Sequence, residues 1–171
     1  MKFTAATLVA ALGLAAGCAA TPSVTAPAVP ASLQPPANQA AAFEILAEGV
    51  QIYECTAGEW KFKGPEAVLM DRNGRPMGKH YGGPTWGAVD GSTVVAELVS
   101  RADSPDRDAI PHLLLRAKSH GGNGMYTGVR SIQRVDTVGG KVPAHACTQD
   151  KAAQVARVPY KATYYLYLDK A

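Results

Sequence analysis

The chain has 171 residues, of which 47% are hydrophobic, and a formal net charge of +3 at pH 7. This length fits one domain preceded by a targeting segment, and the apolar content is sufficient for a packed core. The basic residues are scattered along the chain, which excludes the clustered positive charge typical of nucleic-acid-binding proteins. No nucleic-acid partner is therefore expected.

The N-terminal segment has the features of an export signal. Lys2 supplies a minimal positive charge, and a short apolar stretch follows from Phe3 to Ala16. This stretch is shorter than the ~20 apolar residues that a membrane-spanning helix needs. We therefore interpret residues 1–17 as a signal peptide, of the lipoprotein type.

The end of the signal resembles a bacterial lipobox. The sequence Leu14-Ala15-Ala16-Gly17-Cys18 places a cysteine where that pattern joins lipid to the thiol and begins the mature protein. Ala15 stands where the pattern prefers leucine, and ordinary cleavage after Ala20 is the alternative. Ala19 follows the cysteine, which by resemblance to the sorting rules of diderm bacteria implies the outer membrane. We expect an exported protein, anchored to the membrane by lipid on Cys18 and facing the periplasm.

A Pro- and Ala-rich linker is predicted over residues 18–38. It contains no charged side chain and no hydrophobic periodicity. Proline-rich chain of this kind is extended and semi-rigid. Such a segment suits a tether between a lipidated cysteine and a single folded domain, which we expect over residues 39–171.

The remaining chain predicts short β-strands separated by glycine and proline. Glu48-Gly49 is read as a turn, Gly64-Pro65 as the end of a strand with Phe62 facing inward, and Asp71–Gly74 as a hairpin turn. Residues 149–158 are predicted to hold one helical turn or a loop. The clearest strands are expected over residues 43–47, 50–55, 59–63, 66–71, 93–101, 110–118, 129–137 and 161–168.

These patterns contain no convincing amphipathic helix. The expected fold is all-β, a compact sandwich or barrel of about nine short antiparallel strands with little helix.

Two cysteines remain after Cys18. Cys55 and Cys147 form an even pair in an exported protein, which predicts a disulfide bond. Free buried thiols, or a metal site shared with histidine, are the alternatives. The chain has no Cys-x-x-Cys motif, so a thioredoxin-like redox role has no support.

The densest group of unusual residues lies between Gly78 and Ser92. His80 is a weak candidate for a general base, because a carboxylate follows at Asp90; the alternative is a histidine that only stabilises a turn. The glycines allow a ligand to approach the backbone or simply form a bulge, and Trp86 suits ligand stacking or a core anchor. The predicted ligand-binding residues are Tyr81, Gly82, Gly83, Trp86 and Asp90.

Six separated motifs stand out: the segments 49–55 with Trp60, 80–86 with 90–92, 110–115, 132–135 with Thr137 and 139–140, 157–160, and Tyr164-Tyr165. In order and spacing they resemble the domain-of-unknown-function family 3455, which is found in bacteria and fungi mostly as secreted or exported proteins. The similarity covers essentially the whole mature domain, but it implies no activity, because none is established for the family.

The sequence favours a binding protein of the cell envelope over an enzyme, without deciding between them. No complete catalytic constellation, metal-ligand spacing or cofactor motif is present. We expect no metal and no cofactor, and a small molecule or an envelope protein as partner. A small secreted hydrolase or isomerase that uses His80 is the alternative.

Overall fold

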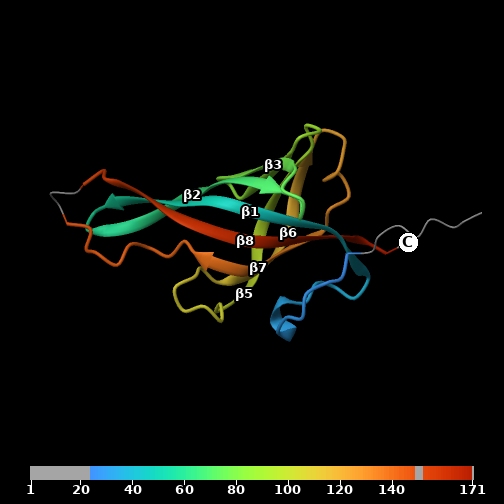
Figure 1. Ribbon diagram of the computed structural model, residues 1–171, viewed down its shortest axis with the longest axis horizontal. Helices are drawn as coiled ribbons and strands as arrows, with labels where there is room; N and C mark the ends of the chain where they lie inside the picture. The colour runs from blue at the N-terminus through green and yellow to red at the C-terminus, as the bar shows by residue number, and fades with distance from the viewer. Residues whose placement is uncertain (1–23, 149–151, 171) are drawn as a thin grey trace, which may run out of the picture.

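Eight antiparallel strands form one sheet that closes on itself as a barrel in the computed structural model (Figure 1). The structure describes residues 24–148 and 152–170. Each strand pairs with the next along the chain, and the last pairs with the first. The strands are β1 (Gln39–Thr56), β2 (Glu59–Met70), β3 (Pro76–Tyr81), β4 (Thr85–Ala88), β5 (Thr93–Ala102), β6 (His112–Gly121), β7 (Ser131–Gly139) and β8 (Val155–Asp169).

The predicted all-β fold is confirmed, and the barrel is the form it takes. The strands are fewer and longer than expected, because β1 continues through Gly49 and β2 through Gly64-Pro65. The predicted turn at Glu48-Gly49 is therefore wrong. A Cβ atom at Gly49 would lie 2.1 Å from the carbonyl oxygen of Glu66. The glycine thus allows β1 and β2 to approach closely where a turn was expected.

The glycine-rich stretch between Gly78 and Ser92 forms most of a hairpin. His80 in β3 lies opposite Trp86 in β4, and Gly82-Gly83-Pro84 connects the two strands. Gly83 has φ +100°, a conformation that residues with a Cβ atom rarely adopt. This turn places His80 and Trp86 side by side inside the barrel.

The last strand is longer than the tyrosine-rich segment suggested. β8 begins at Val155, so the last four residues of the region predicted as a helical turn or loop are strand. Residues 149–151 of that region lie outside the described residues. The long β8 pairs with β1 along most of its length and closes the barrel.

The main core fills the barrel. Alternate residues along each strand point inward, so side chains from all sides of the ring meet there. Complete burial of each large apolar side chain contributes roughly 1.5–3 kcal/mol. Fully or almost fully buried members include Ile45, Leu69, Trp86, Ile132 and Leu166.

The chain before β1 packs on the outside of the barrel. A short 3-10 helix, η1 (Ala31–Leu33), buries Leu33 completely, and the side-chain amide of Gln133 donates to the Leu33 carbonyl oxygen at 2.5 Å. Val24 and Val29 pack near Tyr167 on the outer face of β8. Of the predicted linker, only residues 24–38 are described.

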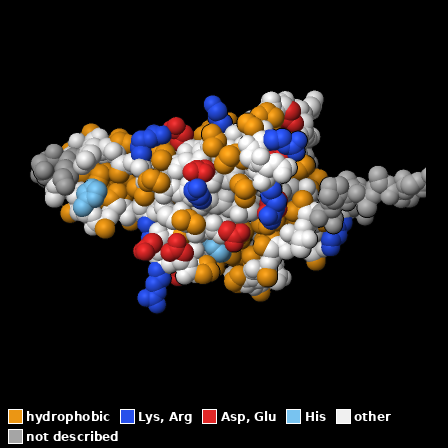
Figure 2. Space-filling view, viewed as in Figure 1, with side chains coloured by type: hydrophobic (Ala, Val, Ile, Leu, Met, Phe, Trp, Pro, Cys, Tyr) orange, Lys and Arg blue, Asp and Glu red, His pale blue; other side chains and the backbone are white. Residues whose placement is uncertain are grey.

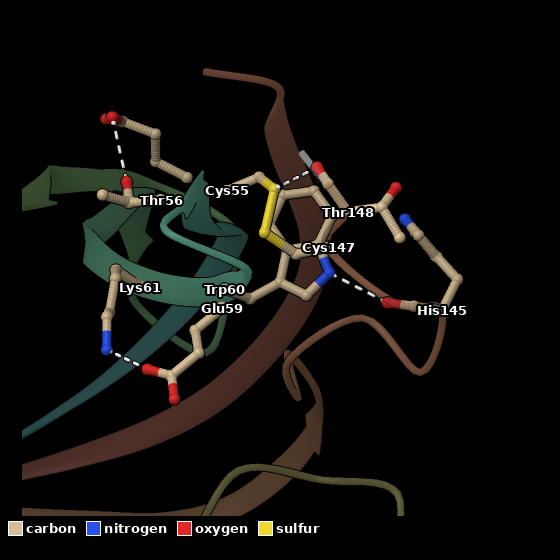
Figure 3. Close-up of a disulfide and its surroundings, with 9 residues drawn as sticks. Cys55, Thr56, Glu59, Trp60, Lys61, His145, Cys147 and Thr148 are labelled. Carbon is tan, nitrogen blue, oxygen red and sulfur yellow. Dashed lines mark hydrogen bonds and ion pairs between the residues drawn. A yellow bond between two sulfur atoms is a disulfide. The ribbon is translucent and has the colours of Figure 1, made fainter. Parts of the chain in front are cut away.

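A disulfide bond joins Cys55 at the end of β1 to Cys147, with Cα atoms 5.4 Å apart (Figure 3). Nearby, the indole nitrogen of Trp60 donates to the carbonyl oxygen of His145 at 3.0 Å, and the two rings meet edge to face. The segment after β7 is thereby held against the end of the β1–β2 hairpin. This disulfide agrees with an extracytoplasmic location.

Acidic and basic side chains are intermixed on the face shown in Figure 2. Among the described residues, cross-strand ion pairs join Lys161 to Glu48 and Arg157 to Glu66. These exposed pairs contribute little to stability individually. Within the described ranges, no helix is long and apolar enough to cross a membrane.

Candidate functional site in the barrel interior

A pocket of about 460 Å³ lies inside the barrel, a volume within the range of small-molecule sites. Every strand contributes to its wall, so the pocket is a property of the closed barrel and not of one loop. The contributing residues include Gln51 (β1), Phe62 (β2), His80 (β3), Trp86 (β4), Leu98 (β5), Leu115 (β6), Arg134 (β7) and Tyr164 (β8).

Most of the wall is apolar, and part of it meets solvent. Phe62 and Leu98 both line the pocket, yet 54% and 56% of their surfaces are exposed. The expected inward position of Phe62 is thus only half correct, since the ring faces both pocket and solvent. These two side chains mark the open side of the pocket.

Three aromatic rings form the buried part of the wall. The His80 and Trp86 rings are stacked, with centroids 4.1 Å apart and an interplanar angle of 17°. Tyr164 meets both rings edge on, with centroids 5.2 Å from His80 and 5.3 Å from Trp86. This packing gives the buried wall a rigid aromatic surface.

His80 is neutral in this environment. Its Nδ1 lies 2.8 Å from the carbonyl oxygen of Thr85, and a carbonyl can only accept, so Nδ1 carries the proton. Burial lowers the pKa of His80 from 6.5 to about 3, although the hydrogen bond to Thr85 opposes the shift; the nearby positive charge of Arg134 lowers it further. A general base with this pKa is poorly matched to neutral pH.

The described part of the pocket wall offers no nucleophile of the serine, threonine or cysteine type. Its one carboxylate, Glu97, forms an ion pair with Arg116.

Arg134 is the notable charged group of the wall. Its Nε and Nη2 atoms donate to the carbonyl oxygen of Pro111 at 3.1 and 2.9 Å. A guanidinium has five N–H donors, so three remain after these two bonds. Within residues 24–148 and 152–170, no carboxylate forms an ion pair with Arg134. The pocket therefore contains an uncompensated positive charge.

Three side chains that line the pocket also carry buried polar atoms without a partner. They are Nε2 of Gln51, Nε1 of Trp86 and the hydroxyl of Tyr164, on side chains at most 2% exposed. The Tyr164 hydroxyl lies near Arg134 and Tyr160 without forming a hydrogen bond of normal geometry to either. Unpaired buried donors are costly, by about 1–3 kcal/mol each, and are uncommon in folded proteins.

The residues predicted as a ligand site do not all lie together. His80, Gly83 and Trp86 line the pocket. Tyr81 follows His80 along β3 and therefore points to the outer face, where 44% of its surface is exposed and its ring lies near Gly87. Gly82 is in the turn close to the Lys63 carbonyl oxygen, outside the pocket wall.

Asp90 organises the turn that follows β4. Its Oδ1 accepts from the backbone amide and the hydroxyl of Ser92, at 2.9 and 2.6 Å, and its Oδ2 accepts from the amide of Met125 at 2.7 Å. The Ser92 hydroxyl bond, followed by the two backbone bonds, lowers the pKa of Asp90. The structure thus separates Asp90 from His80 and gives it three local donors.

The site residues predicted from the sequence did not include Gln51, Arg134 or Tyr164, although all three lie in the motifs that carry the family resemblance. They come from strands far apart in the chain, and no short motif joins them. Strand alternation offered one signal, because Arg134 shares a face with the fully buried Ile132. An arginine on an inward face is unusual and indicates either a buried ion pair or a ligand.

No metal centre is apparent in the part of the chain that the structure describes, since it contains no group of three or more His, Cys, Asp or Glu side chains that could hold an ion. The Cys55 and Cys147 sulfurs are joined to each other.

Comparison with known proteins gives one assignment. Residues 35–168 match the family described as "Protein of unknown function (DUF3455)". No match was found among curated proteins or among solved structures. The matched region includes all eight strands apart from the last residue of β8, and with it the whole pocket. The chain is a member of the DUF3455 family.

Proposed function

We propose that this protein binds a small, largely apolar molecule inside its barrel and does not transform it. The observation that carries the proposal is the pocket of about 460 Å³ to which all eight strands contribute. Closed eight-stranded barrels of this size are just wide enough to hold one small ligand.

The lining supports binding over catalysis. Phe62, Trp86 and Leu115 provide apolar surface, as in most small-molecule sites. His80 is held neutral, and its tautomer is set by the Thr85 carbonyl, so it serves as part of the wall. A preformed pocket in a disulfide-linked barrel requires little ordering when a ligand enters.

We propose further that the domain acts in the cell envelope, attached to the outer membrane by lipid on Cys18. The lipobox-like sequence, the proline-rich segment after it and the Cys55–Cys147 disulfide support this location. A tethered binding domain facing the periplasm would hold or transfer poorly soluble molecules near the membrane.

Binding is tested with the neutral fluorescent probe N-phenyl-1-naphthylamine and two matched variants. Leu98 and Val99 are neighbours in β5 and are each 56% exposed, but only Leu98 lines the pocket. We expect saturable, one-to-one binding to the wild-type protein. Leu98→Trp should weaken it by about tenfold or more by filling the open side, whereas Val99→Trp should not. No saturable binding, or equal loss in both variants, contradicts the proposal.

Lipid attachment is tested independently of ligand binding. In a diderm bacterial host, the wild-type protein should separate with the membrane fraction and Cys18→Ala with the soluble envelope fraction. The mass of the mature N-terminal peptide should show a diacylglycerol-modified Cys18. A mature chain that begins after Ala20 would exclude the anchor.

A further inference from the structure

We propose that the pocket recognises an amphipathic carboxylate: an apolar body with one anionic head group bound by Arg134, Gln51 and Trp86. This inference rests on the proposed binding function and specifies the ligand class of the same site.

The first reason is the charge of the wall. Three cationic side chains line the pocket, against one carboxylate. Lys63 pairs with Glu54, and Glu97 pairs with Arg116. Neither Arg134 nor Lys118 forms an ion pair among the described residues. An anionic head group would supply the missing counter-charge where solvent is partly excluded, which strengthens the attraction.

The second reason is the hydrogen-bonding capacity of Arg134. The Pro111 carbonyl occupies Nε and Nη2 on one side of the guanidinium and fixes its orientation. The three N–H groups that remain can donate to a carboxylate. If Arg134 served only to hold Pro111, its three remaining N–H donors and its positive charge would have no partner.

The third reason is the set of buried polar atoms without partners. The Gln51 and Trp86 nitrogens that lack partners, Nε2 and Nε1, are donors only. Their side chains are 2% and 1% exposed and line the same pocket as Arg134. Donors call for an acceptor-rich ligand, and a carboxylate offers about four lone-pair sites on two oxygens.

The remaining wall determines the body of the ligand. Leu113, Leu115 and Val95 join the aromatic residues in the lining and offer no partner for a polar chain. An alkyl or aryl group suits this surface. The unpaired Arg134 in a mostly apolar wall therefore selects for one charged end on an otherwise apolar molecule.

The experiment compares matched ligands by isothermal titration calorimetry. The pairs are octanoate with 1-octanol, and 2-naphthoate with 2-naphthalenemethanol, which keep the body and change the head group. In the wild-type protein, the carboxylate of at least one pair should bind about tenfold or more tightly than its alcohol, as expected for a charge-assisted hydrogen bond. Its affinity should also fall with added salt more steeply than that of the alcohol.

Two arginine variants test whether Arg134 causes the preference for carboxylates over alcohols. Arg134→Gln should reduce the ratio of carboxylate to alcohol affinity about tenfold. Arg130→Gln removes a charge that pairs with Asp169 away from this pocket, and it should leave the ratio unchanged. If Arg134→Gln does not fold, Gln51→Leu provides the second test and should lower the same ratio.

The outcomes separate this inference from the function on which it rests. If acids and alcohols bind equally in the wild-type protein, the pocket binds apolar molecules but the carboxylate preference is refuted. If acids are preferred but both arginine variants reduce the ratio equally, the role of Arg134 is refuted. If neither these ligands nor the naphthylamine probe binds, the proposed binding function itself fails.

Discussion

The imidazole of His80 lies flat against the indole of Trp86, with ring centroids 4.1 Å apart. The two residues are directly opposite each other in the β3–β4 hairpin, and their stack forms part of the buried wall of the pocket. Because His80 is buried in this wall, its charged form is disfavoured, and burial thus links the protonation of His80 to the stability of the barrel.

The pH dependence of stability follows from that link. The folded pKa of His80, about 3, lies below its ordinary value of 6.5, so between these values the unfolded chain binds a proton that the folded chain does not. The unfolding free energy should therefore be fully retained above about pH 6.5 and fall as the pH decreases. The slope for one such group approaches about 1.4 kcal/mol per pH unit.

Urea unfolding between about pH 7.5 and about pH 5 measures this slope and stays above the range in which carboxylates titrate. His80→Gln should make the slope shallower. His112 is less buried and its pKa is also lowered, by burial first, so His112→Gln is the control with a smaller effect. Equal slopes in the wild-type and His80→Gln proteins would show that His80 does not remain neutral in the fold.

Removing the hydroxyl group should affect the unfolding free energy differently at Tyr53 and at Tyr164. The Tyr53 hydroxyl donates to the Gly140 carbonyl oxygen at 2.7 Å, whereas the buried Tyr164 hydroxyl has no partner. Tyr53→Phe should cost about 1 kcal/mol of unfolding free energy, and Tyr164→Phe should be neutral or slightly stabilising without ligand. Denaturant unfolding of both variants measures the difference. A loss at Tyr164 as large as that at Tyr53 would indicate a hydrogen bond to that hydroxyl.

The Cys55–Cys147 disulfide should be a major source of stability. It closes a loop with a sequence separation of 92 residues, and in the chain-entropy model such a bond contributes roughly 4 kcal/mol. The double variant Cys55→Ser/Cys147→Ser should lose about 2–5 kcal/mol, measured by unfolding under non-reducing conditions. Adding a reductant should destabilise the wild-type protein and leave the double variant unaffected. A reductant effect on the variant would point to another cause.

Asp90 should matter for stability and not for binding. Its carboxylate accepts hydrogen bonds from Ser92 and Met125 and thus joins the β4–β5 turn to the loop after β6. Asp90→Ala should lower the melting temperature by a few degrees and leave naphthylamine binding unchanged. Asp106→Ala, which removes a single exposed hydrogen bond to the Asp108 amide, is the control with a smaller effect. If the folded Asp90→Ala variant loses naphthylamine binding, Asp90 contributes to the binding site and the prediction is wrong.

Local patterns predicted the all-β fold and the family. Some features depend only on neighbours in the chain, so they can be predicted without a structure. Examples are the alternation of side chains along β5 and β7 and the turn at Asp71–Gly74. Gly49 and Gly64 were misread because glycine marks both turns and close approaches of strands. Which of these applies depends on the opposing strand, such as the Glu66 carbonyl beside Gly49.

The sequence by itself determined the strand-rich composition, the motifs that identify the family and the pairing candidates Cys55 and Cys147. Only the tertiary structure decided the site. Closure of the barrel by β1 and β8 brings Gln51, Arg134 and Tyr164 to the pocket that His80 and Trp86 line, and it turns Tyr81 to the outside. The physical reason is that an unpaired charge or an unpartnered donor is defined by its surroundings in space, which residue order along separate strands does not specify.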